Sequence, residues 1–214
     1  MPLAMKIAVI VTVFCGIQLT VCLTVAMAVY PGGYSFWQNT MSDLGRDETA
    51  SGEPNPIGSK VYNTSLAVGT LGMAAMWLVV PGAYIDNRSL ARTVSAAGVL
   101  SVVGMLIDAL TPADSAEFGH MVGNGMLGVG GISALCITSV AILSKAGRHR
   151  LYAGLTGGVL LLSSIHFYQY AKHFWFGGQW TWAAPIAQKL LLIAAVTWIV
   201  WGVLSAGISS QAKA

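Results

Sequence analysis

Charged residues are scarce in this chain, and their scarcity is the most informative feature of its composition. Only 9% of the 214 residues are Asp, Glu, Lys or Arg, whereas 55% are hydrophobic. A soluble domain carries about a quarter charged residues, because it needs a well-hydrated surface. The composition therefore excludes an ordinary soluble protein and predicts a polytopic membrane protein that forms a single domain.

Several sequence features of other protein classes are also missing. The chain has no basic stripe, which argues against a nucleic-acid partner. Its three cysteines, Cys15, Cys22 and Cys136, all lie in apolar segments, so they favour roles as small hydrophobic side chains over a disulfide framework. Neither a G-x-S-x-G nucleophile motif nor an H-E-x-x-H zinc motif occurs. No family of hydrolases is therefore indicated by a local motif.

The hydrophobic residues are concentrated in six runs, each long enough for the roughly 20 residues that a membrane-spanning helix needs. The predicted spans are 7–29, 62–84, 91–110, 119–143, 151–171 and 185–206. The first run exceeds the apolar core of a signal peptide, about 7–15 residues, and is expected to be retained. Residues 30–61 are expected to form a loop, in which Pro54 and Pro56 exclude a regular helix. The predicted fold is an all-α bundle of six transmembrane helices spanning residues 1–214.

The distribution of basic residues predicts the orientation in the membrane. The two termini and the even-numbered loops hold most of them, namely Lys6, Arg88, Arg92, Lys145, Arg148, Arg150 and Lys213. The odd-numbered loops hold only Arg46, Lys60 and Lys172. We therefore expect a multi-pass protein of the cell membrane with both termini in the cytoplasm. Aromatic residues after the first span and between the last two spans are typical of a membrane interface and agree with this orientation.

Polar side chains gather at the predicted outer ends of the spans and in the outer loop. Ionisable residues in or beside a membrane span are costly and are functional candidates by default. The candidate pocket residues are Asn39, Ser42, Asp43, Asp108, Asp114, His120, Asn124, Gln169 and Lys189, and two further histidines, His166 and His173, lie in and just after the fifth span. Because several elements deliver these groups to one depth, the sequence predicts a polar Asp/His pocket that opens outward, with Asp43 and Asp108 as acceptors or bases.

Four interpretations of these residues remain open. The first is a site that binds a lipid headgroup or a small ligand. The second is a zinc-dependent lipid hydrolase, because His120, His166, His173 and Asp108 have the donor types that zinc prefers. The third is haem held between histidines on facing helices. The fourth is a structural cap, in which Asp108 pairs with Lys189 or a histidine. Membrane lipids are the expected partners, and a homo-oligomer is left open as well.

Two connecting segments carry a resemblance to a known family. YPGGYSFWQNTMSDLG, residues 30–45, is followed by NPIGSKVYNTSL, residues 55–66, which leads into the second span. Together with LTPADSAEFGH, residues 110–120, these segments resemble the DUF998 family of integral membrane proteins. The resemblance covers nearly the whole chain and implies a six-helix bacterial or archaeal membrane protein, without an established reaction.

The first of these segments is also similar to a second group. Its element of Asn39, Ser42, Asp43 and Gly45 is similar to the first-loop motif of the Frag1/DRAM/Sfk1 group. This similarity implies a role in membrane-lipid handling. A more distant similarity to the alkaline ceramidase and adiponectin-receptor superfamily of zinc hydrolases is limited, because the chain has six predicted spans instead of seven and lacks a His-x3-His pair in the last one.

Overall fold

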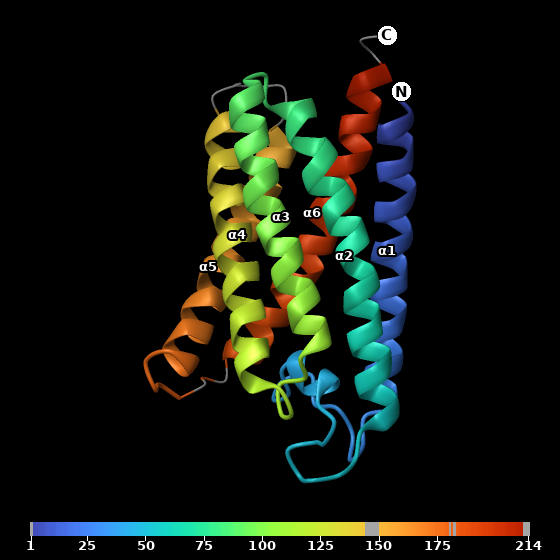
Figure 1. The fold of residues 1–214 in the computed structure, drawn as a ribbon, viewed down its shortest axis with the longest axis vertical. Helices are drawn as coiled ribbons and strands as arrows, with labels where there is room; N and C mark the ends of the chain where they lie inside the picture. The colour runs from blue at the N-terminus through green and yellow to red at the C-terminus, as the bar shows by residue number, and fades with distance from the viewer. Residues whose placement is uncertain (1, 144–149, 180, 182, 212–214) are drawn as a thin grey trace.

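The computed structural model describes residues 2–143, 150–179, 181 and 183–211, and these residues form a helical bundle without a β-strand (Figure 1). Six of the described helices are long and apolar enough to cross a membrane. They are α1 (Leu3–Ala28), α2 (Pro56–Tyr84), α3 (Arg88–Leu110), α4 (Glu117–Leu143), α5 (Arg150–Phe174) and α6 (Ala183–Gln211), and a short 3-10 helix, η1 (Ser42–Gly45), lies between α1 and α2. The predicted all-α bundle of six membrane-spanning helices is confirmed.

The six long helices run alternately up and down and form a closed ring. Each helix packs against its neighbours in the chain, and α6 also packs against α1 and α2, which closes the ring (Figure 1). The start of α1 and the end of α6 lie at one end of the bundle. The opposite end, here termed the loop end, carries the long α1–α2 loop and the short α3–α4 turn. The predicted outer polar clusters therefore share one end of the molecule.

The second helix begins earlier than the sequence predicts. It starts at Pro56, whereas residue 62 was expected, and the preceding loop is correspondingly shorter. Proline is well suited to the first helical position, since its missing N–H would have no partner inside the helix. The buried Asn55 side chain precedes it and donates from Nδ2 to the carbonyls of Leu44 and Arg46, each at 3.1 Å. The prediction that Pro56 excludes a helix was therefore wrong, and the other helix boundaries shift by smaller amounts.

Helices α3 and α4 approach each other closely around two glycines, Gly104 and Gly123. A Cβ atom at Gly123 would lie 2.7 Å from the amide nitrogen of Asp108 and 2.9 Å from the Gly104 carbonyl oxygen. These distances leave no room for a side chain, so the two backbones touch, as small residues allow in membrane helices. The contact brings Asp108 of α3 next to the first turns of α4.

An aromatic core fills the bundle on the side away from the loop end. Tyr152 of α5 stacks on Tyr84 of α2, with ring centroids 4.6 Å apart, and on Trp198 of α6, at 5.8 Å. Trp77 of α2 lies 5.5 Å from Trp198. The indole nitrogen of Trp198 donates to the Thr156 hydroxyl at 2.9 Å, so this buried polar atom is satisfied. These rings connect three helices and close one side of the bundle interior.

Candidate functional site

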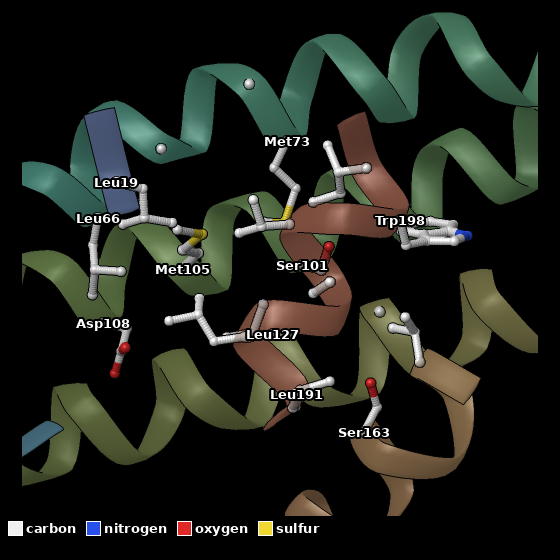
Figure 2. A pocket seen from close by; sticks show the side chains of 18 of the residues that line it. Leu19, Leu66, Met73, Ser101, Met105, Asp108, Leu127, Ser163, Leu191 and Trp198 are labelled. Carbon is white, nitrogen blue, oxygen red and sulfur yellow. The ribbon is translucent and has the colours of Figure 1, made fainter. Parts of the chain in front are cut away.

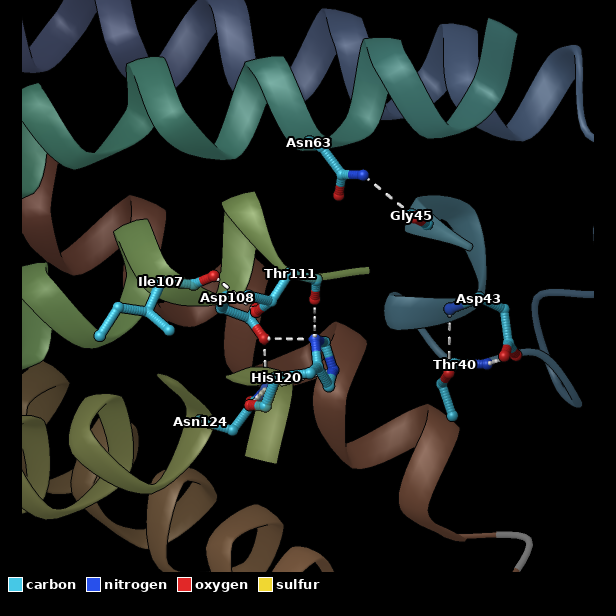
Figure 3. Close-up of polar contacts among 9 residues, drawn as sticks. All are labelled: Thr40, Asp43, Gly45, Asn63, Ile107, Asp108, Thr111, His120 and Asn124. Atoms are coloured by element: carbon cyan, nitrogen blue, oxygen red, sulfur yellow. Dashed lines mark hydrogen bonds and ion pairs between the residues drawn. The ribbon is translucent and has the colours of Figure 1, made fainter. Parts of the chain in front are cut away.

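A buried carboxylate, Asp108, is held between α3 and α4 near the loop end. Its Oδ1 atom lies 2.8 Å from His120 Nδ1, and it also accepts a hydrogen bond from the Asn124 side chain (Figure 3). His120 Nδ1 lies 3.0 Å from the Thr111 carbonyl oxygen as well. Asp108 and His120 are only 8% and 5% exposed, so neither group relies on water for its partners. Of the two partners considered for Asp108 in the structural-cap interpretation, the structure places the histidine beside it.

A buried lysine of α6, Lys189, fastens the first loop to the bundle. It is 2% exposed, and its Nζ donates to the Asn39 carbonyl at 2.5 Å and to the Pro185 carbonyl at 3.4 Å. The ammonium group also lies over the rings of Tyr34, at 5.2 Å, and Phe36, at 4.9 Å. Cation–π contacts of this kind become stronger where water is excluded. Lys189 is therefore surrounded by groups of the loop and its own helix.

Asp43 organises the turn of the first loop that leads into η1. Its carboxylate accepts from the Thr40 amide at 2.7 Å, and its own amide donates to the Thr40 hydroxyl at 3.2 Å (Figure 3). The carboxylate also accepts from the Asn39 side chain at 3.5 Å. Met41, which lies in the same turn, connects the loop to α6, because its amide donates to Gln188 Oε1 at 2.7 Å. These local bonds account for Asn39 and Asp43 as structural groups of the loop.

The α3–α4 turn is tied to the same loop through Asp114. Its Oδ2 accepts from the Glu48 amide at 2.9 Å, and Ser115 Oγ donates to Asp47 Oδ2 at 2.9 Å. Partial burial acts to raise the pKa of Asp114. The backbone N–H groups of Glu48 and Asp47 and the charge of Arg46 outweigh it and hold that pKa below its ordinary value. The first loop is therefore fastened at both α6 and the α3–α4 turn.

A cavity of about 250 Å³ lies between the helices, beneath this loop. Residues from all six long helices line it, together with Met41 of the loop (Figure 2). Figure 2 shows Asp108 at one end and Trp198 of the aromatic core at the other, with apolar side chains such as Leu127 between them. Along this middle stretch the hydroxyl of Ser101 donates back to a carbonyl of its own helix, so it adds little polarity. The cavity is therefore apolar over most of its length.

The polar lining of the cavity is concentrated at the loop end. Its larger polar side chains are those of Tyr62, Asp108, Asn124, His166, Tyr170 and Gln188, contributed by five helices. Within the described part of the chain, the Tyr170 hydroxyl and His166 Nδ1 are buried and have no hydrogen-bond partner. Buried polar atoms without partners are uncommon in proteins and call for an explanation. The polar end thus offers hydrogen-bonding capacity that the protein itself leaves unused.

The predicted pocket residues therefore fall into separate places. Asp108 and Asn124 line the cavity, whereas His120 is paired with Asp108 but is not part of the cavity lining. Asn39, Ser42 and Asp43 belong to the first loop, and Asp114 and Lys189 form hydrogen bonds with its backbone. On α5, Gln169 has a buried Oε1 without a described partner, and His173 Nδ1 lies 2.9 Å from the Gly178 carbonyl oxygen.

The predicted metal ligands His120, His166, His173 and Asp108 are distributed in the same way. Among the described residues, no group of three or more His, Cys, Asp or Glu side chains lies close enough together to hold a metal ion. Only His120 and Asp108 of the predicted set are in contact. The arrangement of the histidines gives no support to a zinc site, and His120 Nδ1 is already engaged by Asp108 and Thr111.

The apolar part of the site was not predicted from the sequence. Trp77, Trp198 and Leu127 line the cavity but carry no ionisable group, so a search for polar clusters passes over them. A useful signal was present in Trp77 and Trp198, because both lie well inside their helices and away from the membrane interface that these residues usually occupy. Comparison with protein-family models, curated proteins and solved structures finds no match to this chain.

Proposed function

We propose that this protein binds a lipid-like amphiphile inside the membrane. The hydrocarbon chain of the ligand occupies the apolar stretch of the cavity, and its polar group lies at the loop end, beside Asp108 and Tyr170. The single observation that carries the proposal is the division of one cavity into a long apolar part and a short polar end. Its volume of about 250 Å³ exceeds the roughly 150 Å³ of an engineered apolar cavity that binds benzene.

The unpartnered polar atoms support the same proposal. A buried hydrogen-bonding group without a partner costs about 1–3 kcal/mol. The Tyr170 hydroxyl and His166 Nδ1 both face this cost, and both residues line the cavity. The Tyr170 ring is held by Phe174, at a centroid distance of 4.5 Å, and by Trp175, at 6.4 Å. A ligand group that pairs with these atoms would remove the cost without a change in the protein.

The membrane setting favours a lipid-like ligand over a water-soluble one. We propose that the loop end faces outward, as the basic residues of the termini and even-numbered loops indicate. The polar end of the cavity then lies at the depth of the outer headgroups, and its apolar part lies at the depth of the acyl chains. The similarity of Asn39, Ser42 and Asp43 to the first-loop motif of the Frag1/DRAM/Sfk1 group also supports a role with membrane lipids.

A cavity-filling variant at Gly131 tests the proposal. Gly131 lines the cavity, and a Cβ atom added there would have only the Ser101 Cβ within 4 Å, at 3.8 Å. In Gly131→Phe the ring can therefore enter the cavity without a clash at its base. The matched control is Gly157→Phe, because Gly157 is exposed on α5 and an added Cβ there meets nothing within 4 Å.

The measurement is the amount of amphiphile that remains bound after purification in a mild detergent and exchange into phosphatidylcholine nanodiscs. Mass spectrometry of the extracted lipids is expected to find about one retained amphiphile per wild-type or Gly157→Phe protein, and a loss of at least tenfold for Gly131→Phe. Equal retention by both variants would refute the proposal. It would also be refuted by a wild-type protein that retains no amphiphile and that no added amphiphile stabilises against heat.

A further inference from the structure

We infer that the ligand of this cavity carries an uncharged hydroxyl as its polar group, and that the cavity discriminates against anionic headgroups. The inference rests on the proposed function, and it adds the chemical class of the amphiphile. It follows from two features of the polar end, namely the sign of its charge and the kind of hydrogen-bonding capacity that remains there.

The charge at the polar end is unfavourable for an anion. Asp108 lies in the wall, and no Lys or Arg is found among the described residues that line the cavity. Even a protonated His120 would only neutralise Asp108, so the pair has no positive charge left for a ligand. An anion buried here would therefore lack a cationic partner, and beside an uncharged His120 it would also be repelled by the Asp108 carboxylate. Fatty acids, phosphates and sulfates are therefore poor ligands for this site.

The nearest buried cation, Lys189, does not reverse this conclusion. Its ammonium group already donates to the carbonyls of Asn39 and Pro185 and lies over the rings of Tyr34 and Phe36. It is 2% exposed and is not part of the cavity lining, so a ligand in the cavity cannot pair with it directly. Within the first loop, the carboxylate of Asp43 also favours the charged form of Lys189.

The unused hydrogen-bonding capacity matches a hydroxyl. A tyrosine hydroxyl can donate or accept, and Nδ1 of a neutral histidine donates in one tautomer and accepts in the other. His166 and Tyr170 are four residues apart on α5, so their side chains are neighbours on one face of the helix. One ligand hydroxyl can accept from one of these groups and donate to the other. A ketone or ester carbonyl only accepts, so it pairs with both groups only when both of them donate, whereas a hydroxyl pairs with them in either tautomer of His166.

The experiment compares two amphiphiles that have the same saturated chain, 1-octanol and octyl sulfate. Each is titrated as a competitor against tritiated 1-octanol bound to the protein in phosphatidylcholine nanodiscs, with empty nanodiscs as the blank. We expect the alcohol to compete at least tenfold more strongly than the sulfate. The Tyr170→Phe variant removes one hydrogen bond and should weaken alcohol binding about fivefold. Tyr168→Phe is the matched control, because Tyr168 is 65% exposed on the same helix.

The outcomes separate the inference from the proposed function. Equal or stronger competition by the sulfate, with amphiphile retention still lost in Gly131→Phe, would overturn the hydroxyl class and leave amphiphile binding in place. Alcohol binding that is unchanged in Tyr170→Phe would overturn the assigned contact in the same way. Failure of both amphiphiles to bind, together with equal retention by the two glycine variants, would overturn both. Because Tyr170→Phe removes only a hydroxyl that has no hydrogen-bond partner among the described residues, the fold of the variant should be preserved.

Discussion

Asp108 and His120 illustrate how a charged side chain can be kept inside a bundle that crosses a membrane. The carboxylate receives the His120 ring and the Asn124 side chain, both delivered by one turn of α4. This arrangement depends on the close glycine contact between α3 and α4, since a side chain at Gly123 would collide with the backbone at Asp108. At the scale of single residues, the pairing of Asp108 with His120 therefore depends on the close approach of the α3 and α4 backbones.

Removing one member of this pair is expected to cost more stability than removing both. In His120→Leu the Asp108 carboxylate stays buried without its main partner, which should destabilise the protein by about 3 kcal/mol. In the double variant Asp108→Leu/His120→Leu no unpaired charge remains, so part of that loss should be recovered. Denaturant titrations in detergent micelles measure both values, with Val122→Leu, exposed on α4, as a control that should change little. Strictly additive losses would contradict this account.

Asp114 should make the stability of the loop end dependent on pH. Its folded-state pKa is lowered, so the ionised carboxylate stabilises the fold above the unfolded value of about 3.9, and this contribution is lost as the pH falls through the folded value. Asp114→Asn should therefore lower the free energy of unfolding by roughly 1 kcal/mol at pH 7. The gap to the wild type should close as the pH is lowered below about 4. Thermal unfolding across this range checks the prediction, and a gap independent of pH would refute it.

At the scale of the elements, the first loop lies over one end of the cavity and is held there by hydrogen bonds to α6 and to the α3–α4 turn. Two fastenings come from adjacent residues of α6, since Gln188 accepts from the Met41 amide and Lys189 donates to the Asn39 carbonyl. A third comes from the α3–α4 turn, where Asp114 accepts from the Glu48 amide. Met41 is both part of the loop and part of the cavity lining, so the position of the loop affects the shape of the polar end.

Loss of the Lys189 fastening should loosen this loop. In Lys189→Met the ammonium group that bonds to Asn39 and contacts Tyr34 and Phe36 is absent, while much of the apolar stem remains. We expect tryptic cleavage after Arg46, in the middle of the loop, to accelerate at least threefold in nanodiscs. The control Lys60→Met removes an exposed lysine of the first turns of α2 and should leave that rate unchanged. Identical cleavage rates in both variants would show that Lys189 does not hold the loop.

At the scale of the whole molecule, the orientation in the membrane decides which compartment the polar end faces. The proposed orientation predicts that a cysteine in the first loop is labelled from outside intact cells, whereas one at the start of α3 is not. Ala50→Cys and Ser89→Cys place exposed thiols at these two positions. A membrane-impermeant maleimide should modify the first variant at least tenfold faster than the second, with the unsubstituted chain as the blank. Faster labelling of Ser89→Cys than of Ala50→Cys would show that the bundle has the opposite orientation in the membrane.

Hydrophobicity by itself determined the class and the outline of this protein. Runs of about 20 apolar residues can be satisfied only as membrane-spanning helices, because the backbone finds no hydrogen-bond partners in lipid. The six spans and the shared end of the polar clusters follow from this local property. The start of α2 did not, since Pro56 is compatible with both a loop and a first helical position, and the Asn55 contacts to Leu44 and Arg46 decide between them.

The site depended on tertiary structure, because its parts become neighbours only when the helices pack. Helical periodicity puts His166 and Tyr170 on one face of a helix, but only the packing of the six helices shows that both residues line an apolar cavity. The pairing of Asp108 with His120, and not with Lys189, follows from the close α3–α4 contact. The apolar end could not be found from polar residues at all, since it is formed by Trp77, Trp198 and their neighbours, whose packing leaves space that no local pattern reveals.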